Sequence, residues 1–436
     1  MKPDTGRIAA FNVLKRVLLS GGYSNISLDE EIKRNLLSSD EKKLAAKISY
    51  GVLERKVTLQ IILNKFITRS PKPEIKVILF MGIYQILYLD NIPPHAAVNS
   101  SVDLAKMISK NKAQAGFVNA ILHKILREEK EKILEYAYKT DEGRYSISSD
   151  MLSIIRSSLK ERTAVFLESS FDKPPIYLRV NTLKTTAEAL IALLAEENVS
   201  SEKIDGFNEA LRITGNIDIT KTECYKNGLF FVQDLSSQMA IKALEIESDS
   251  RVFDLCAAPG GKSFCAAMYL KEGNITSFDI HEHKIKLIKD ASERLNIENL
   301  KVEKKDALDL SDREDMADIV ICDVPCSGSG VIRRKPEIRY KNDDYKDLYN
   351  LQTKILNSAA RMVKIGGKLL YSTCSVNKLE NEEVVKKFLG LNDGFEVLKQ
   401  DKICGKIKGN CEFGTTILPE DFGGDGFFFS VIERRG

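Results

Sequence analysis

The sequence predicts a multidomain protein: an all-α N-terminal domain, a small α+β linker domain and an α/β Rossmann-like C-terminal domain. Three observations lead to this prediction. Apolar residues keep helical spacing early in the chain, strand signals first enter in its middle, and strands alternate with helical stretches in its last part. A length of 436 residues allows about three domains. We place them at 1–140, 141–235 and 236–436.

Composition is that of a folded globular protein, with 43% hydrophobic and 29% charged residues. The longest apolar run, Val77 to Leu89, contains Gln85 and is too short to cross a bilayer, so it predicts a buried helix. Lys15 and Arg16 lie inside the first apolar segment, which is not how a secretory signal is built. We therefore expect a cytoplasmic protein with no membrane partner.

The N-terminal domain is predicted from helical periodicity between residues 6 and 130. Apolar side chains recur every three or four residues at Ile8, Phe11, Leu14 and Leu18, and again at Leu44, Ile48 and Val52. Helix breaks are expected at Gly21-Gly22, at a capping box from Ser38 to Glu41, at Pro71 and Pro73, and at Pro93-Pro94, which opens another helix.

Charge is unevenly distributed along the chain. Residues 1–150 hold 24 Lys and Arg against 17 Asp and Glu, and the remainder holds 41 against 45. Clustered basic side chains favour nucleic-acid binding, because they release counterions from phosphates. A well-solvated helical surface explains the same excess equally well.

The linker and C-terminal domains are predicted from strand signals. Residues 173–181 alternate like a strand after a proline turn, and residues 230–234 form a second strand. Further strands are expected near 251–255, 275–279, 300–304, 317–323, 367–373, 394–399 and 426–432. Their alternation with helices predicts a mainly parallel sheet that has helices on both faces.

A glycine-containing turn follows the first strand of that sheet, in the motif Asp-Leu-Cys-Ala-Ala-Pro-Gly-Gly-Lys-Ser at 254–263. Glycines permit a turn tight enough to bring backbone amides and a helix N-terminus against a ligand. The motif is not a phosphate-binding P-loop, because Cys256 stands where that loop needs its first glycine. We expect a cofactor over this edge.

Four carboxylates are expected around that turn, since the carboxyl ends of parallel strands converge on one crevice. They are Asp254, Asp279, Asp306 and Asp323. Asp279 ends the second strand, where an acidic side chain can accept hydrogen bonds from ribose hydroxyls. Several carboxylates repel a pyrophosphate but suit a sulfonium cation, which favours S-adenosylmethionine over NAD.

Two cysteines come directly after strands that should end at the same edge. Cys326 stands in Asp-Val-Pro-Cys-Ser-Gly-Ser-Gly at 323–330, and Cys374 stands in Ser-Thr-Cys-Ser at 372–375. The chain has six other cysteines. Cys256, Cys265 and Cys322 have apolar neighbours in the sequence, and the remaining three are Cys224, Cys404 and Cys411. We expect no metal, because His281 and His283 are on the wrong segment for a compact site, and no disulfide in a reducing compartment.

A pair of thiols beside a methyl donor suits methylation of a pyrimidine. Carbon 5 of the ring becomes nucleophilic only after carbon 6 has been attacked, and a thiolate can add there and later leave. Asp323 can hold the N3 and exocyclic amine edge of the ring. The target base must be unstacked before the thiol can reach it. The basic run from Arg333 to Arg339 either binds the flanking phosphates or is a solvated loop.

The three motifs, in this order, closely resemble RNA 5-methylcytosine methyltransferases of the Sun/NOL/NSUN group. Tyr50 to Leu53, Pro93 to Asn99 and Gly116 to Leu122 resemble the NusB-like RNA-binding helical domain. Together the chain resembles the bacterial small-subunit (16S) rRNA cytosine-5 methyltransferases.

This resemblance implies the roles of individual residues. Cys374 is the attacking thiol and Cys326 assists product release. The implied S-adenosylmethionine contacts are Cys256, Ala257, Ala258, Pro259, Gly260, Gly261, Lys262, Asp279, Asp306 and Asp323. We expect 16S rRNA as partner, no obligate protein partner and a monomer. The alternatives are DNA or another RNA such as tRNA as substrate, or a non-catalytic NusB-like RNA-binding or antitermination factor.

Overall fold

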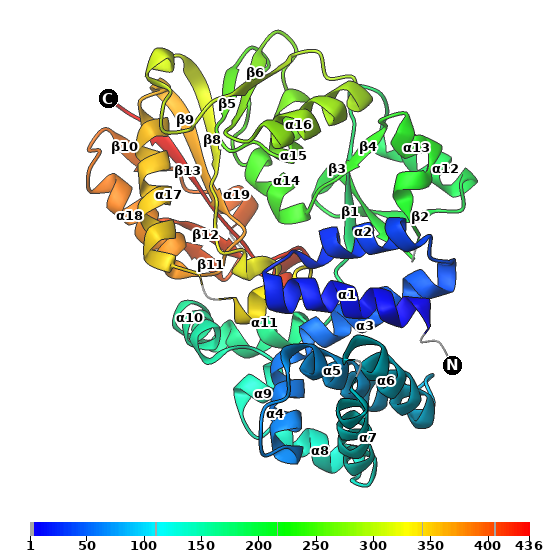
Figure 1. The fold of residues 1–436 in the computed structure, drawn as a ribbon. Helices are drawn as coiled ribbons and strands as arrows, with labels where there is room; N and C mark the ends of the chain where they lie inside the picture. The colour runs from blue at the N-terminus through cyan, green and yellow to red at the C-terminus, as the bar shows by residue number, and fades with distance from the viewer. Residues whose placement is uncertain (1–3, 110, 216, 342, 405–406) are drawn as a thin grey trace. The chain divides into compact units, whose positions relative to one another are not determined.

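The computed structural model describes residues 4–109, 111–215, 217–341, 343–404 and 407–436, and the side chain of Cys404 lies outside the described part. The chain divides into two compact units. One comprises the described residues within Met1–Arg156 and Ile332–Asn342, and the other those within Ser157–Val331 and Asp343–Gly436. Figure 1 shows the fold coloured along the chain. The boundaries at 140 and 235 stay predictions.

The first unit is helical, as predicted. Its helices are α1 (Thr5–Ser20), α2 (Ser24–Asn35), α3 (Ser39–Glu54), α4 (Lys56–Phe66), α5 (Pro73–Tyr88), α6 (Pro94–Ser109), α7 (Lys112–Leu126), α8 (Lys130–Ala137), α9 (Asp141–Tyr145), the start of α10 (Ser149–Leu159) and the 3-10 helix η5 (Pro336–Tyr340). The predicted capping box is present, since Ser38 N donates to Glu41 Oε2 at 2.9 Å and Glu41 N to Ser38 Oγ. The run after Val77 forms the buried α5. Among the described residues, no helix is long and apolar enough to cross a membrane.

The segment with η5 is separated in sequence from the other helices of this unit but packs within it. The Arg339 side chain has no solvent exposure, and its Nη1 donates to the carbonyl oxygen of Tyr145 at 2.9 Å. The hydroxyl of Ser24 donates to Glu337, and the ammonium of Lys56 lies 4.5 Å from the ring centroid of Tyr340. The interpretation of this run as a grip on phosphates is therefore wrong for Arg339, because its charge is buried.

The second unit begins with a small antiparallel sheet. Its elements are η1 (Lys160–Arg162), α11 (Thr163–Ser169), β1 (Ile176–Val180), α12 (Ala187–Glu196), β2 (Ser200–Ile204), β3 (Phe207–Thr214), η2 (Ile219–Lys221), α13 (Glu223–Lys226) and β4 (Phe230–Val232). The strand order is β2-β3-β1-β4, and every pairing is antiparallel. This is the β-α-β-β-α-β arrangement of ferredoxin-like domains. The sequence predicted β1 and β4 but missed β2 and β3.

The larger sheet carries the predicted parallel strands. Its elements are α14 (Leu235–Lys242), β5 (Arg251–Asp254), α15 (Gly261–Ala267), β6 (Asn274–Asp279), α16 (Glu282–Leu295), β7 (Leu300–Lys304), η3 (Ser311–Arg313), β8 (Ala317–Asp323), η4 (Ser329–Val331), α17 (Tyr345–Ala360), β9 (Val363–Thr373), η6 (Lys378–Glu380), α18 (Glu382–Leu389), β10 (Phe395–Val397), α19 (Asp401–Cys404), β11 (Gly409–Cys411), β12 (Gly414–Ile417), α20 (Pro419–Phe422) and β13 (Phe427–Arg434). The strand order is β11-β12-β13-β9-β8-β5-β6-β7, with β10 also pairing β13.

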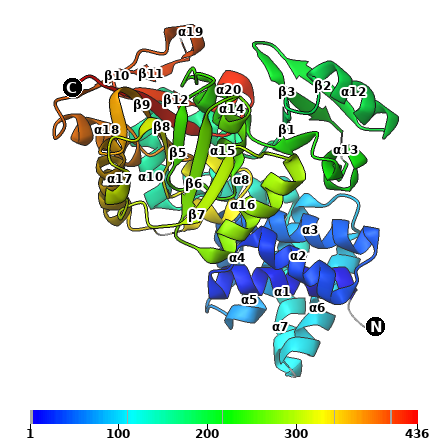
Figure 2. The ribbon, with the colours of Figure 1, turned by 90° about the horizontal axis from the view of Figure 1, so that it is seen from above.

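Parallel pairing holds from β7 through β6, β5 and β8 to β9, and the strands beyond β9 are antiparallel. Successive side chains point to opposite faces. Val252 belongs to the core that includes α14 and α15, whereas Phe253 belongs to the core that includes α17 and α18. Helices therefore cover both faces, as predicted (Figures 1 and 2). The strand order reverses between β5 and β8, which is where such sheets form a ligand crevice.

Candidate active site

The glycine turn joins β5 to α15. Its backbone is tied to the next strand, since Ala257 N donates to the Phe278 carbonyl at 3.0 Å. Gly260 has φ of +105°, and a Cβ at that position would lie 2.3 Å from the ring of Phe264. Only glycine satisfies both conditions.

A cavity of about 160 Å³ lies against this turn. It is lined by Val232, Gln233, Ser237, Asp254, Cys256, Ala257, Ala258, Pro259, Gly261, Lys262 and Asp323. Most of the predicted cofactor residues thus share one cavity. Cys256, whose neighbours in the sequence are apolar, is half-buried and lines this cavity. Cys265 and Cys322 are fully buried, as expected.

Asp254 is fully buried beside this cavity. Its Oδ2 accepts a hydrogen bond from Ser263 Oγ at 2.6 Å, but its Oδ1 has no hydrogen-bond partner among the described residues. Burial, together with the charges of Asp323 and Asp279, raises the pKa of Asp254 to about 7. The hydrogen bond from Ser263 and the charge of Lys262 lower this pKa, but their effect is smaller. A carboxylate with one free oxygen suits a cationic ligand.

Asp279 and Asp306 do not line this cavity, and neither does Gly260. The Asp279 carboxylate is buried and accepts from His281 N at 3.0 Å. Asp306 is exposed and accepts from Leu308 N at 2.9 Å. Of the four predicted carboxylates, only Asp254 and Asp323 meet in the cavity, and the cofactor roles of the other two stay predictions.

Asp323, at the end of β8, is held on both of its oxygens. Lys262 Nζ lies 2.7 Å from its Oδ2, and Ser372 Oγ donates to its Oδ1 at 2.9 Å. Burial lowers the pKa of Lys262, but the charge and hydrogen bond of Asp323 outweigh burial and raise it overall. The cavity therefore contains a fixed ion pair whose partners come from the glycine turn and from a neighbouring strand.

The two thiols predicted at the sheet edge are in contact. Cys326 Sγ and Cys374 Sγ lie 3.1 Å apart, because β8 and β9 are adjacent and parallel and both loops leave at their carboxyl ends. The hydrogen bond with Cys374, burial, and the charges of Cys374, Glu380 and Asp323 raise the pKa of Cys326 well above its usual value. Cys326 is thus held as a thiol at neutral pH.

Sequence reasoning missed Glu380, which ends η6. Its side chain has no solvent exposure and accepts hydrogen bonds from both thiol loops. In the sequence it stands in a polar run, Asn377 to Glu383, that resembles an exposed helix start. No local signal marks it, because its partners come from distant segments.

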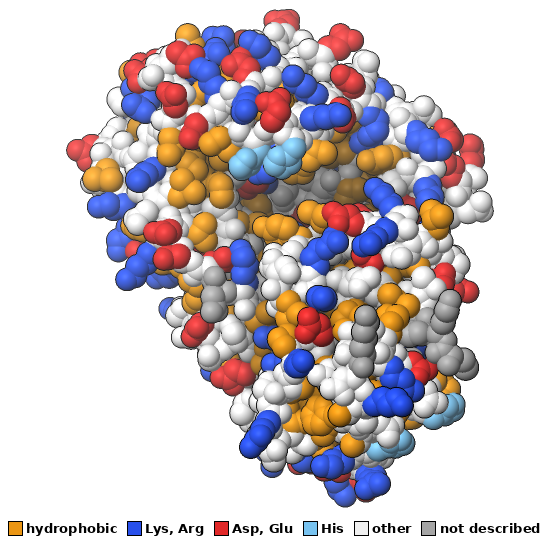
Figure 3. Space-filling model, viewed as in Figure 1, with side chains coloured by type: hydrophobic (Ala, Val, Ile, Leu, Met, Phe, Trp, Pro, Cys, Tyr) orange, Lys and Arg blue, Asp and Glu red, His pale blue; other side chains and the backbone are white. Residues whose placement is uncertain are grey.

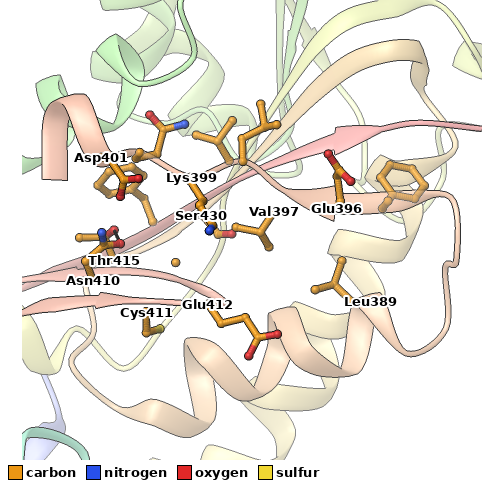
Figure 4. A pocket seen from close by; sticks show the side chains of 16 residues that line it. Leu389, Glu396, Val397, Lys399, Asp401, Asn410, Cys411, Glu412, Thr415 and Ser430 are labelled. Atoms are coloured by element: carbon orange, nitrogen blue, oxygen red, sulfur yellow. Dashed lines mark hydrogen bonds between the residues drawn. The ribbon is translucent and has the colours of Figure 1, made fainter. Parts of the chain in front are cut away.

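A second cavity, of about 720 Å³, lies among β10, β11, β12 and β13. Figure 4 shows its lining, with Glu396, Asp401 and Glu412 among the labelled side chains. It contains none of the predicted site residues, and the exposed Cys411 is the cysteine in its lining. Within the described ranges, no group of three or more His, Cys, Asp or Glu side chains is placed to hold a metal ion.

The face of the molecule in Figure 3 has no single basic patch. Lysine and arginine side chains are interspersed there with acidic and apolar ones. The excess of basic residues in the first 150 positions is therefore not gathered on this face.

Comparison with known proteins identifies three regions of the chain. Residues 4–127 match the NusB family, residues 151–220 the ferredoxin-like domain of RsmF/B-like methyltransferases, and residues 241–433 the model for the 16S rRNA methyltransferase RsmB/F. The probable ribosomal RNA small subunit methyltransferase B of Bacillus subtilis is 34% identical over all of both chains. The ribosomal RNA small subunit methyltransferase B of Proteus mirabilis is 28% identical over 96% of each. The crystal structure of PH0851 is 26% identical, with a TM-score of 0.83 over 100% of this chain and 99% of that one.

Proposed function

This chain belongs to the RsmB/F family of small-subunit rRNA methyltransferases, and from that premise we propose that it methylates carbon 5 of a cytosine in 16S rRNA through a covalent bond to Cys374. Methyl transfer from S-adenosylmethionine to rRNA is the activity of the family. The position on the base, the covalent step and the residue roles are the proposal.

The chemistry of the residues that line the cavity beside the glycine turn suits the methyl donor. Two buried side-chain oxygens from residues that line it, Asp254 Oδ1 and Gln233 Oε1, have no hydrogen-bond partner within the part of the chain that the structure describes. Both are acceptors, which suits a ligand that brings an ammonium group and a sulfonium. We assign binding to these two residues and to the turn from Cys256 to Lys262. When bound, S-adenosylmethionine supplies an electrophilic methyl group on a cationic sulfur.

The contact between the two sulfurs is the observation that carries the proposal. In the proposed reaction the thiolate of Cys374 adds to carbon 6 of cytosine, and the electron pair moves to carbon 5, which then accepts the methyl group. Carbon 5 afterwards loses its proton, and the bond between Cys374 and carbon 6 breaks. A second thiol at 3.1 Å is well placed to assist this last stage, which we assign to Cys326.

Asp323 is assigned to the edge of the cytosine ring. Its carboxylate is held in place by Lys262 and Ser372, so it does not have to be ordered when the base arrives. A fixed carboxylate at the N3 and exocyclic amine edge would stabilise charge that develops there after attack at carbon 6.

Replacement of either thiol tests the roles. Cys374→Ala should abolish turnover and leave no covalent complex, because the attacking atom is gone. Cys326→Ala should accumulate a protein–RNA adduct, because attack proceeds but release stalls. The adduct is measured as a slower band on a denaturing gel, with the wild-type protein as control. Adduct in Cys374→Ala and none in Cys326→Ala would reverse the two roles.

Bisulfite sequencing tests the substrate. RNA from cells that lack this protein should lose 5-methylcytosine at a position in 16S rRNA, and the mark should return with the wild-type gene. Loss of the mark from tRNA instead would contradict the rRNA assignment while leaving the chemistry intact.

A further inference from the structure

A single buried carboxylate, Glu380, joins the two loops that carry the thiols. Its Oε1 accepts from the hydroxyls of Ser327 and Ser375 at 2.6 and 2.9 Å, and its Oε2 accepts from Ser327 N at 2.8 Å. Ser327 directly follows Cys326, and Ser375 directly follows Cys374. Each thiol is therefore one residue away from a group bound to the same carboxylate.

The remaining partners of this carboxylate are two side-chain amides. Gln352 Nε2 donates to Oε2 and Asn377 Nδ2 to Oε1, each at 3.2 Å. Both amides are fixed in orientation, since Gln352 also donates to the Pro325 carbonyl and the Oδ1 of Asn377 accepts from Leu379 N. With Ser327 N, three donors that cannot accept point at the two oxygens. The side chain of Glu380 therefore acts mainly as an acceptor at this site.

The backbone of Glu380 is fixed as well. Tyr371, in β9, donates its hydroxyl to the Glu380 carbonyl at 2.5 Å. The side chain has no solvent exposure, so water cannot replace a partner that is removed. This side chain therefore holds the loops after β8 and β9 in one arrangement.

We propose that Glu380 is a positioning residue that clamps these two loops and thereby sets the contact between the sulfurs of Cys326 and Cys374. The effect of this clamp on catalysis rests on the proposed function, whereas the hydrogen bonds that form the clamp do not depend on it. Glu380 does not line the cavity assigned to the methyl donor. Loss of the clamp should therefore slow the steps that use the thiols and leave cofactor binding unchanged.

Three variants separate the charge from the packing. Glu380→Ala removes every hydrogen bond of the side chain. Glu380→Gln, with its amide nitrogen in the place of Oε1, keeps the bonds from Ser327 N and Gln352. It loses the bond from Asn377, and the hydroxyls of Ser327 and Ser375 must turn to accept from the amide instead. The double variant Glu380→Gln with Asn377→Asp reverses the donor and the acceptor of the Asn377 bond. It therefore restores a complementary pair and moves the negative charge to position 377, three residues away.

A matched control exists in the ferredoxin-like part of the chain. The carboxylate of Glu197 also accepts from two backbone N–H groups, those of Glu223 and Cys224. Glu197 is more exposed than Glu380, and Glu197→Gln removes a carboxylate that touches neither thiol loop.

The first measurement needs no RNA. Diamide takes up two electrons and two protons from a pair of thiols in contact, and the Cys326–Cys374 disulfide is followed by peptide mass mapping. Glu380→Ala should form it at least about tenfold more slowly than wild type, because a displacement of about 1 Å is enough for such a loss. Glu380→Gln should be intermediate, the double variant close to wild type, and Glu197→Gln unchanged. S-adenosylmethionine affinity, measured by calorimetry, should stay within about twofold in every variant.

The second measurement is the single-turnover rate of adduct formation with RNA containing 5-fluorocytosine. This rate should be lowest in Glu380→Ala, intermediate in Glu380→Gln and close to wild type in the double variant, with the RNA dissociation constant unchanged. Disulfide rates in Glu380→Ala and Glu380→Gln equal to the wild-type rate would overturn the inference. So would a loss of cofactor affinity in step with the disulfide rate, which indicates general unfolding. If the disulfide rates follow the expected order but wild type forms no RNA adduct, the proposed function fails and the clamp stands.

Discussion

At neutral pH Asp254 is divided between its neutral and ionised forms. Burial raises its pKa to about 7, and the neighbouring Asp323 and Asp279 contribute. Below pH 7 the carboxyl is mostly neutral and attracts a cation weakly; above pH 7 it is ionised and attracts the cation more strongly. Cofactor binding and ionisation of this residue are therefore linked.

Affinity for S-adenosylmethionine should rise between pH 6 and 7.5. The gain is about fourfold if the bound cation lowers the pKa of Asp254 by one unit, which corresponds to 1.36 kcal/mol. Titration calorimetry at several pH values measures it, with the uncharged-sulfur product S-adenosylhomocysteine as a comparison ligand. Asp254→Asn should bind with little dependence on pH over this range. A pH response in that variant equal to the wild-type response would assign the linkage to another group.

Single residues also show where sequence reasoning stops. Cys326, Cys374 and Asp323 were placed at one sheet edge from their positions after apolar strands, and the structure brings these three together. Glu380 escaped notice because burial of a charged side chain depends on partners such as Gln352, which is 28 residues away. Nothing in the local sequence specifies that contact.

At the scale of elements, two glycines touch where the thiol loops meet β13. Gly330, in η4, donates its N–H to the Cys374 carbonyl at 2.9 Å, and Gly426 N donates to the Gly330 carbonyl at 3.0 Å. A Cβ at Gly330 would lie 2.0 Å from the carbonyl oxygen of Gly426 and 2.8 Å from that of Cys374. The backbones approach this closely only because neither residue has a side chain.

Gly330→Ala should therefore force the loops apart. We expect a loss of about 2 kcal/mol in the free energy of unfolding from overpacking, and slower adduct formation because the Cys374 backbone moves. Chemical denaturation and the denaturing gel measure the two effects. Gly116→Ala is the control: its Cβ would meet nothing within 4 Å in α7, and it should be neutral or stabilising by up to about 1 kcal/mol. Equal stability of the two variants would contradict the close approach.

Strand prediction succeeded where side chains alternate or form apolar runs. It failed for two hairpins, β2 with β3 and β11 with β12, each of which has one strand at the edge of its sheet. The residues of β2 are all exposed or only partly buried, so no pattern in Ser200–Ile204 marks a strand, and it forms because it pairs with β3. The hairpin of β11 and β12 was missed for a related reason. Gly409–Cys411 is short and largely exposed, and its extended form depends on pairing with Gly414–Ile417. Edge strands are set by their neighbours more than by their own sequence.

At the scale of the whole molecule, the first 150 residues carry the basic excess. If these residues hold RNA, replacement of exposed lysines there should lower the salt dependence of binding. The triple variant Lys42→Gln, Lys72→Gln and Lys124→Gln should reduce the slope of log affinity against log salt by up to about 0.9 for each lysine that contacts a phosphate. Filter binding to 16S rRNA at several salt concentrations measures the slope.

A matched triple variant changes the same charge elsewhere. Lys271, Lys286 and Lys289 are exposed lysines of the second unit. Their replacement by Gln should leave the slope closer to wild type. Indistinguishable slopes for the two triple variants would favour the alternative that the basic helices are only a solvated surface.

The segment around Arg339 makes the helical unit discontinuous in sequence. The second part of that unit lies within the methyltransferase region of the sequence. The chain leaves the second unit after Val331 and enters it again at Asp343. A gene fragment that stops at residue 156 would lack the guanidinium that binds the Tyr145 carbonyl and the ring that lies under Lys56. One protease cut between the units cannot release either of them whole. Anyone who grafts this helical unit onto another enzyme must therefore transplant two stretches of coding sequence.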